Sequence, residues 1–139
     1  MPELQTNAAA RARFKAINPH FVVGDVVAEA EYYRDVLGFK ILGYFGEPPV
    51  FAMVARDNAE IQFSKVDEGA EVSPNVSRKN IGLDAYVWVD DVDRLYVELQ
   101  AKGAKILEKP TQRVYNCYEM KVEDPYGFHL VFSQDNSDK

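Results

Sequence analysis

The sequence lacks most of the features that covalent chemistry and membrane insertion require. It contains one cysteine, Cys117, which cannot form an internal disulfide and which we expect to be a partly buried, inert thiol. No apolar run approaches the ~20 residues of a membrane-spanning helix, and the first residues have no apolar secretory core. No glycine-rich phosphate loop or nucleophile elbow is present. We therefore expect a cytoplasmic protein that makes no membrane contact.

Basic residues are fewer than acidic ones, so the formal net charge is −6 and the pI is about 4.9. Nucleic-acid binding needs a concentrated basic face, so this balance excludes nucleic acid as a partner. A cationic small molecule is electrostatically easier to bind. Acidity also serves solubility alone, so charge by itself does not identify the ligand.

What the sequence does contain is an internal repeat of about 65 residues. Residues 23–39 and residues 89–104 each read as a strand end, an aspartate and a helix that stops at a glycine. Asp25 and Asp91 are the predicted N-caps of these helices. The two copies are expected to have the same local structure.

The closing segments of the copies match too, because residues 57–65 (DNAEIQFSK) align with residues 126–134 (YGFHLVFSQ). Each copy predicts the order βαβββ, and 139 residues suit one core shared by both copies. Residues 3–15 are helix-prone. The expected organisation is an N-terminal arm at 1–16, a first module at 17–66, a linker at 67–80, a second module at 81–134 and a tail at 135–139.

Alternate residues of a strand face opposite sides, so the strands at the repeat boundaries divide into two sets. One set is apolar and predicts contact with the helices: Phe21, Val23, Ile61, Phe63, Val87, Val89, Leu130 and Phe132. The other is polar and aromatic: Asn18, His20, Val22, Glu60, Gln62, Ser64, Asp84, Tyr86, Trp88, His129, Val131 and Ser133. The second set could be an open polar surface. A tryptophan beside a tyrosine, with both histidines on the same face, favours a pocket with aromatic walls.

These segments resemble the vicinal oxygen chelate superfamily, which includes glyoxalase I, the extradiol dioxygenases and the bleomycin-resistance proteins. The resemblance covers residues 17–134 and rests on VGDVVAEAEYYRDVLGF, VDDVDRLYVELQAKGA and EDPYGFHLVFSQ. It implies an α+β fold in which two tandem βαβββ modules form a curved mixed sheet with a concave ligand-binding face. It does not fix the function, because this scaffold hosts lyases, isomerases, dioxygenases and binding proteins.

The resemblance also implies where a metal would bind, and there the chain departs from the family. The corresponding positions hold Asn18, Gln62, Asp84 and Val131. Only Asp84 offers an anionic oxygen, so we expect no metal cofactor and binding rather than catalysis. The alternative is a register shifted by two residues, in which a divalent metal such as Fe, Zn, Ni or Mn serves a lyase, isomerase or oxygenase. The ligands would then be His20, Glu60 and His129.

Similarity to the metal-free bleomycin-resistance branch implies a homodimer whose groove sequesters a small aromatic and cationic ligand without altering it. The expected ligand-binding residues are His20, Tyr86 and Trp88 for stacking, Asp84 and Glu60 for charge, and Gln62 and Asn18 for hydrogen bonds. Tyr115 and Tyr118 would lie near the rim of the groove.

Overall fold

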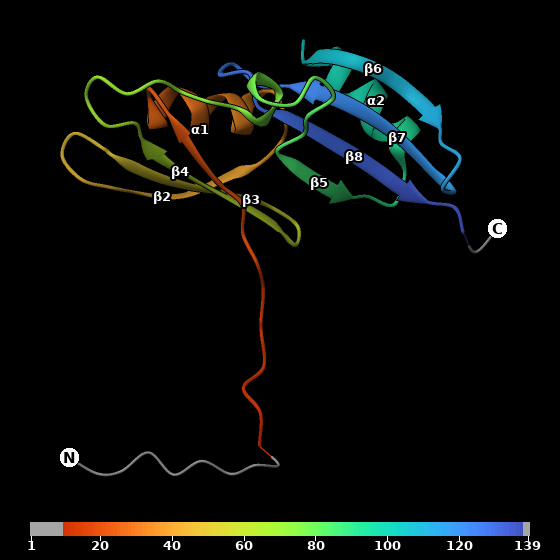
Figure 1. Cartoon of the computed structure of the whole chain (residues 1–139), viewed down its shortest axis with the longest axis horizontal. Helices are drawn as coiled ribbons and strands as arrows, with labels where there is room; N and C mark the ends of the chain where they lie inside the picture. The colour runs from red at the N-terminus through yellow and green to blue at the C-terminus, as the bar shows by residue number, and fades with distance from the viewer. Residues whose placement is uncertain (1–9, 138–139) are drawn as a thin grey trace.

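The computed structural model describes residues 10–137, in which two α-helices and eight strands repeat one order twice (Figure 1). The first module, called module 1, comprises β1 (His20–Val23), α1 (Val26–Asp35), β2 (Lys40–Phe45), β3 (Phe51–Arg56) and β4 (Ala59–Lys65). Module 2 comprises β5 (Ala85–Trp88), α2 (Val92–Ala101), β6 (Lys105–Gln112), β7 (Cys117–Glu123) and β8 (His129–Asp135). The predicted α+β fold with two βαβββ modules is confirmed.

Each module has its own four-stranded mixed sheet. Sheet A has the order β1-β4-β3-β2, and sheet B has the order β5-β8-β7-β6. The first strand of each module runs parallel to the last, and the other neighbours are antiparallel. The two sheets lie side by side in Figure 1, where the sequence had predicted one curved sheet. β1 is an edge strand of sheet A, and β5 is an edge strand of sheet B.

The predicted helix boundaries have clear local causes. Asp25 and Asp91 have extended backbones, and their carboxylates accept amide hydrogens from the first helical turn at 3.0 Å. Gly38 and Gly103, beyond the helix ends, have φ of 77° and 83°, which a residue with a Cβ adopts at a cost. The sequence signals for start and stop are confirmed.

The two modules share one hydrophobic core. Of the predicted apolar set, Phe21, Val23, Ile61, Phe63, Leu130 and Phe132 are buried, and Val87 and Val89 pack against them. The rings of Phe21 in module 1 and Phe128 in module 2 stack with centroids 4.5 Å apart. Arg56 donates to both carboxylate oxygens of Glu98, which joins the β3–β4 turn to α2. The modules therefore form one body.

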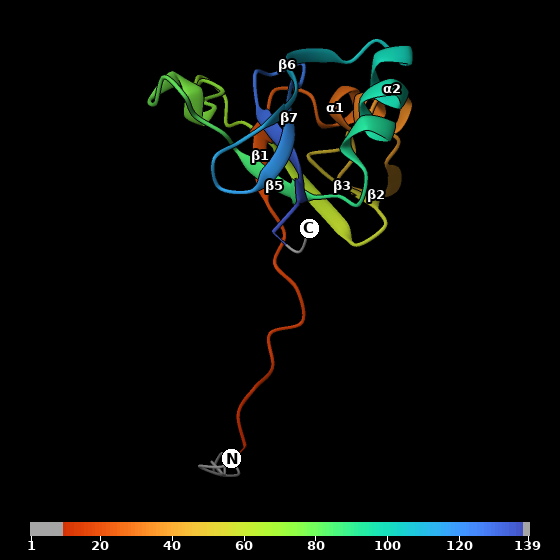
Figure 2. The same cartoon turned by 90° about the vertical axis from the view of Figure 1, so that its right-hand side faces the viewer.

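The segments outside the modules differ most from expectation. Of the helix-prone stretch, residues 10–15 have no helix, and residues 3–9 lie outside the described residues. The described part of the arm projects away from the body in both views (Figure 2). The linker contains a short 3₁₀ turn, η1 (Asn75–Ser77), and β8 continues one residue past the expected module end. Within residues 10–137, no helix is long and apolar enough to cross a membrane.

Candidate functional site

The polar face of sheet A brings four predicted site residues together. The parallel register places His20 opposite Gln62 and Val22 opposite Ser64, so their side chains share a face. His20 Nε2 lies 2.6 Å from Ser64 Oγ, and His20 Nδ1 lies 3.3 Å from Gln62 Oε1. Asn18, just before β1, donates its amide to Glu60 at 2.8 Å, and Gln62 approaches the same oxygen at 3.5 Å. Both the charge of Glu60 and the imidazole of His20 are thus held in a hydrogen-bonded network.

The polar face of sheet B carries the other aromatic residues. Tyr86 and Trp88 project from the same side of β5, with ring centroids 5.1 Å apart and planes at 65°. Trp88 is 61% exposed, an unusual state for the only tryptophan of the chain. An exposed, positioned indole is well suited to stack on a flat ligand.

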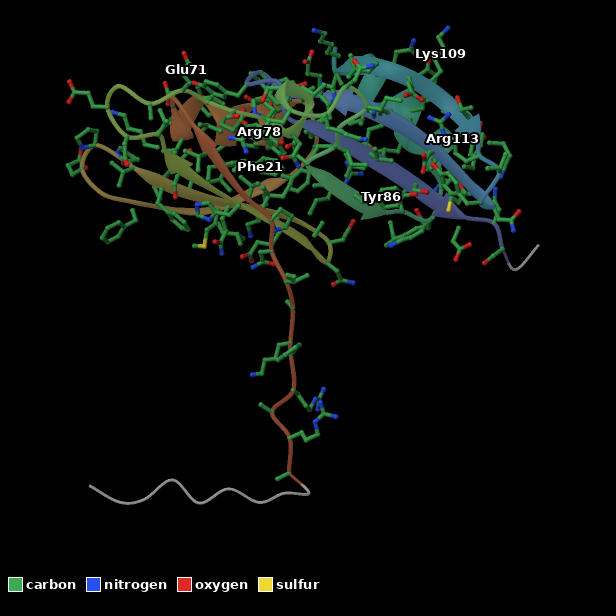
Figure 3. The ribbon with its side chains drawn as sticks, viewed as in Figure 1. Phe21, Glu71, Arg78, Tyr86, Lys109 and Arg113 are labelled. Atoms are coloured by element: carbon green, nitrogen blue, oxygen red, sulfur yellow. The ribbon has the colours of Figure 1, made fainter. Side chains whose placement is uncertain are left out.

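Beneath these rings lies a buried carboxylate that sequence reasoning missed. Glu119 on β7 accepts hydrogen bonds from Tyr86 at 2.5 Å and Arg113 at 3.2 Å, and from the phenol of Tyr115. Arg113 also pairs with Glu108 on β6. Tyr86 from β5 and Arg113, just after β6, thus reach the same carboxylate, and both are labelled beside sheet B in Figure 3. The result is a cluster of two phenols, one guanidinium and two carboxylates beside Trp88.

The charge states in this cluster follow from its contacts. Burial of Glu119 disfavours its ionisation, but hydrogen bonds from Tyr115, Tyr86 and Arg113 outweigh burial and hold its pKa below the ordinary value. Burial and the hydrogen bond to Glu119 raise the pKa of the Tyr86 phenol. Near neutral pH, Glu119 is an anionic acceptor and Tyr86 a neutral donor.

The alternation of polar and apolar residues along β7 could have identified Glu119 as a residue of the polar face. In β7, Glu119 and Lys121 alternate with Met120 and Val122, which are buried in the core. β7 is an inner strand of its module and not one of the strands at the repeat boundaries, whose two faces the sequence predicted. Of the two predicted rim tyrosines, Tyr115 joins the polar cluster, whereas Tyr118 donates to Asp93 on α2 and so lies on the helix side.

Asp84 differs from the other predicted residues because its carboxylate binds backbone amides. Its Oδ1 accepts the amide of Asn75 at 2.9 Å, and its Oδ2 accepts the amide of His129 at 2.8 Å. The carboxylate thus ties the linker to the start of β8. Since both oxygens are engaged by backbone, Asp84 has little capacity left for a ligand.

The residues at the family's metal positions do not fit a metal ion. Val131 has no donor atom, Asp84 is held by backbone amides, and the Asn18 amide donates to Glu60. Nor does one chain assemble the alternative set of His20, Glu60 and His129. His129 is buried on sheet B with Nε2 3.3 Å from Glu123, and among residues 10–137 no three His, Cys, Asp or Glu side chains form a metal-binding group.

Two grooves are lined by five of the seven predicted ligand-binding residues, and Asn18 and Gln62 line neither of them. The first, which we call the inter-module groove, has a volume of about 670 Å³ and is lined by Glu60, Tyr86 and Trp88 among others. The second, of about 690 Å³, runs between β1 and the linker and is lined by His20, Ser64 and Asp84. Either is large enough for a drug-sized molecule.

Comparison with known proteins agrees with this fold. The family model described as the Glyoxalase/Bleomycin resistance protein/Dioxygenase superfamily matches residues 14–132. A comparison with curated proteins found no match. Among solved structures, TioX from Micromonospora sp. ML1 is similar, with 19% identity over 87% of this chain and 98% of that one and a TM-score of 0.69.

Two further structures carry bleomycin in their descriptions. The bleomycin-binding protein from Streptomyces verticillus, complexed with copper(II)-bleomycin, is 23% identical over 88% of this chain and 97% of that one, with a TM-score of 0.66. A bleomycin resistance determinant encoded on the transposon Tn5 is 17% identical over 88% and 98%, with a TM-score of 0.67. At these identities the neighbours show the fold alone. Because the family model matches most of its length, the chain belongs to the glyoxalase, bleomycin resistance protein and dioxygenase superfamily.

Proposed function

We propose that this protein binds a planar, cationic aromatic small molecule and sequesters it without chemical change. The observation that carries the proposal is the exposed Trp88 ring beside Tyr86, at the edge of a groove of about 670 Å³. Stacking on Trp and Tyr faces favours flat and cationic ligands. A protein of the same fold, the bleomycin-binding protein from Streptomyces verticillus, holds copper(II)-bleomycin.

Negative charge near the rings supports the cationic part of the proposal. Glu60 lines the groove with Tyr86 and Trp88, and Asp57 and Asp90 also line it. Glu119 lies beneath Tyr86 as an anion. Gln62 and Asn18 stand beside Glu60 and supply amide groups for hydrogen bonding. Coulomb attraction in such a partly enclosed groove is stronger than in bulk water.

Sequestration needs no metal and no proton transfer. At the family's metal positions Val131 offers no donor atom, and both carboxylate oxygens of Asp84 accept backbone amides. The imidazole of His20 is hydrogen-bonded to Ser64 and Gln62 and has no carboxylate partner among the described residues. Such a site is suited to holding a ligand rather than converting it.

A homodimer is part of the proposal. The polar faces of both sheets carry large exposed apolar side chains, including Phe45 at 72%, Tyr115 at 55% and Val22 at 44%. Large apolar side chains exposed together on a sheet face are typical of an interaction surface. A second copy that covers one or both faces would bury these side chains and enclose the ligand.

The test is a calorimetric titration with a matched pair of probes, 10-methylacridinium and uncharged acridine, followed by bleomycin. The proposal expects saturable binding of the cation, weaker binding of the neutral ring, and weakening of the cation alone as salt rises. Equal affinity for the two acridines would contradict the role of charge. No saturable binding of any of the three probes would contradict the proposed ligand class.

A further inference from the structure

We propose that the inter-module groove has a second binding function, in which it holds a short basic peptide whose backbone pairs with the open edge of β5. The planar ligand proposed above is recognised by its ring and its charge. The peptide is recognised by its amide bonds as well. The inference goes beyond the proposed function and shares only the groove with it.

The groove follows the edge of β5. Five consecutive residues of module 2, 85–89, line it, and residues 56–61 at the β3–β4 turn line it from module 1. Since alternate side chains of a strand face opposite sides, a strand lines a groove continuously only where its edge faces that groove. β5 is the outermost strand of sheet B, and in the described part of the chain no strand pairs with this edge (Figure 1).

The open edge presents free backbone groups to the groove. Val89 donates its amide hydrogen to the carbonyl oxygen of Ser133 on β8 at 2.8 Å. Because alternate residues of a strand point their backbone groups the same way, Val87 also faces β8, and Tyr86 and Trp88 turn their N–H and C=O groups to the other side. Unpaired donors and acceptors of this kind are a template for one more strand.

The length of the edge sets the size of the peptide. β5 has four residues, Ala85–Trp88. A strand rises about 3.3 Å per residue, so the edge spans roughly 13 Å, the length of an extended tetrapeptide. Every second amide of such a peptide would bond to β5, and the amides between them would face away.

The charges of the groove favour basic side chains. Two of its carboxylates are already paired with arginines, Glu98 with Arg56 at 2.7 Å and Asp91 with Arg94 at 3.9 Å. Its other three carboxylates form no ion pair within residues 10–137: Asp57, Glu60 and Asp90. Unpaired anions in a partly enclosed groove attract a cation more strongly than they would in bulk water.

The two faces of sheet B offer different surroundings to alternate side chains of the peptide. Tyr86 and Trp88 project from one face, where a cation gains from lying over an aromatic ring. On the helix side the groove reaches Leu95 and Phe132, which belong to the buried core. A peptide in which arginine alternates with phenylalanine suits both faces.

The test is a backbone N-methylation scan of the peptide acetyl-RFRF-amide, titrated into the full-length protein by calorimetry. Each of four variants replaces one backbone N–H with N–CH₃ and keeps every side chain and the charge. Methylation at two alternate positions is expected to weaken binding about tenfold, because each removes a hydrogen bond to β5. Methylation at the two positions between them should leave the affinity unchanged. The uncharged acetyl-QFQF-amide should bind more weakly than the parent, by a factor that shrinks as salt rises.

Two variants at position 88 test the same hydrogen bond from the side of the protein. Trp88→Ala and Trp88→Pro both remove the indole, but only the proline also removes the backbone N–H. Proline is tolerated on an edge strand where its position faces away from the ladder. Trp88→Pro should bind acetyl-RFRF-amide about tenfold more weakly than Trp88→Ala, whereas the two variants should bind 10-methylacridinium equally. Circular dichroism checks that both variants are folded, and the scan on the wild type does not depend on them.

The outcomes separate this inference from the proposed function. If 10-methylacridinium binds but the peptide does not, or if the four methylated peptides show no alternation, the inference is wrong and the proposed function stands. If the peptide binds with alternation while the acridinium does not bind, the inference stands and the proposed ligand class is wrong. If neither probe binds, both are wrong.

Discussion

The phenol of Tyr33 donates a 2.8 Å hydrogen bond to the carboxylate of Asp124, and this bond joins module 1 to module 2 inside the shared core. The other oxygen of Asp124 accepts the backbone amides of Tyr126 and Phe128 at 2.9 and 3.0 Å. Three donors therefore hold a buried carboxyl group at the start of the β7–β8 turn. Glu29, one helical turn before Tyr33, lies beside them fully buried, with neither carboxyl oxygen hydrogen-bonded among the described residues.

Removing the Tyr33 hydroxyl should loosen the junction between the modules. Tyr33→Phe keeps the ring packing and deprives the Asp124 carboxylate of one buried donor, which is expected to lower the free energy of unfolding by about 1–3 kcal/mol. Urea denaturation measures the change. The matched control is Tyr96→Phe, since the Tyr96 hydroxyl has no hydrogen-bond partner among the described residues. Equal losses in the two variants would contradict the account.

Glu29 should make the stability of the protein depend on pH over a wide range. Burial, together with the neighbouring Asp124 carboxylate, raises the pKa of Glu29 from 4.5 to about 10. The folded protein therefore keeps a proton that the unfolded chain releases above about pH 4.5. Stability should fall as pH rises from that point toward 10, by at most about 1.4 kcal/mol per pH unit.

Glu29→Gln removes this titration and tests its sign. The variant should gain stability relative to wild type as the pH is raised from 5 to 9, because the amide stays neutral throughout. Exposed Glu31 on the same helix provides the control Glu31→Gln, which should follow the wild-type profile. Parallel profiles for wild type and Glu29→Gln would show that Glu29 is ionised in the fold.

Glu119 should contribute the opposite pH dependence. Its pKa is held below the ordinary value, so its contribution to stability is present above the unfolded pKa and is lost as pH falls through the folded pKa. Glu119→Gln should therefore flatten the loss of stability below about pH 4.5. Acid titrations of unfolding free energy, with exposed Glu71→Gln as control, measure this. If the unfolding free energy of Glu119→Gln falls with decreasing pH as steeply as that of the wild type, the pKa of Glu119 is not lowered in the fold.

Much of the fold follows from local sequence signals, and each signal is visible in the structure. Asp25 and Asp91 cap the starts of the two helices, and a glycine with positive φ follows the end of each helix. The alternation of Phe21 and Val23 with His20 and Val22 determines which face of β1 is buried. These signals depend on neighbours in sequence. They can therefore be recognised in the sequence without a structure.

The site is harder to predict because it depends on contacts between distant segments. Asp84 reads as a free anion until the amide of Asn75 in the linker is seen to bind it. In the repeat His20 corresponds to Tyr86 and His129 to Glu60, so the sequence puts both histidines on the polar face, yet they lie on separate sheets. The relative packing of the two modules leaves no local trace in the sequence. Glu119 gains its role from Tyr86 and Tyr115, which reach it across strands.

Trp88 should matter for ligand binding and little for stability. Trp88→Ala removes the exposed stacking surface and is expected to weaken binding of 10-methylacridinium by about tenfold or more. The free energy of unfolding should change by less than about 0.5 kcal/mol, because the side chain is mostly exposed. Val97→Ala, another exposed apolar residue, is the control for both measurements. Unchanged affinity in Trp88→Ala would place the ligand elsewhere.

Metal-independent binding without chemical change is the central claim, and one measurement tests it most directly. The metal-depleted protein is titrated with 10-methylacridinium by calorimetry, with and without added Fe, Zn, Ni or Mn. It is titrated with bleomycin only in the absence of metal, because bleomycin itself chelates such ions. The mass of each recovered ligand is then measured by mass spectrometry. The account predicts saturable binding that metals do not change and a ligand of unaltered mass. Binding that appears only with a metal, or a ligand recovered as a product of different mass, would contradict it and favour a metal-dependent enzyme.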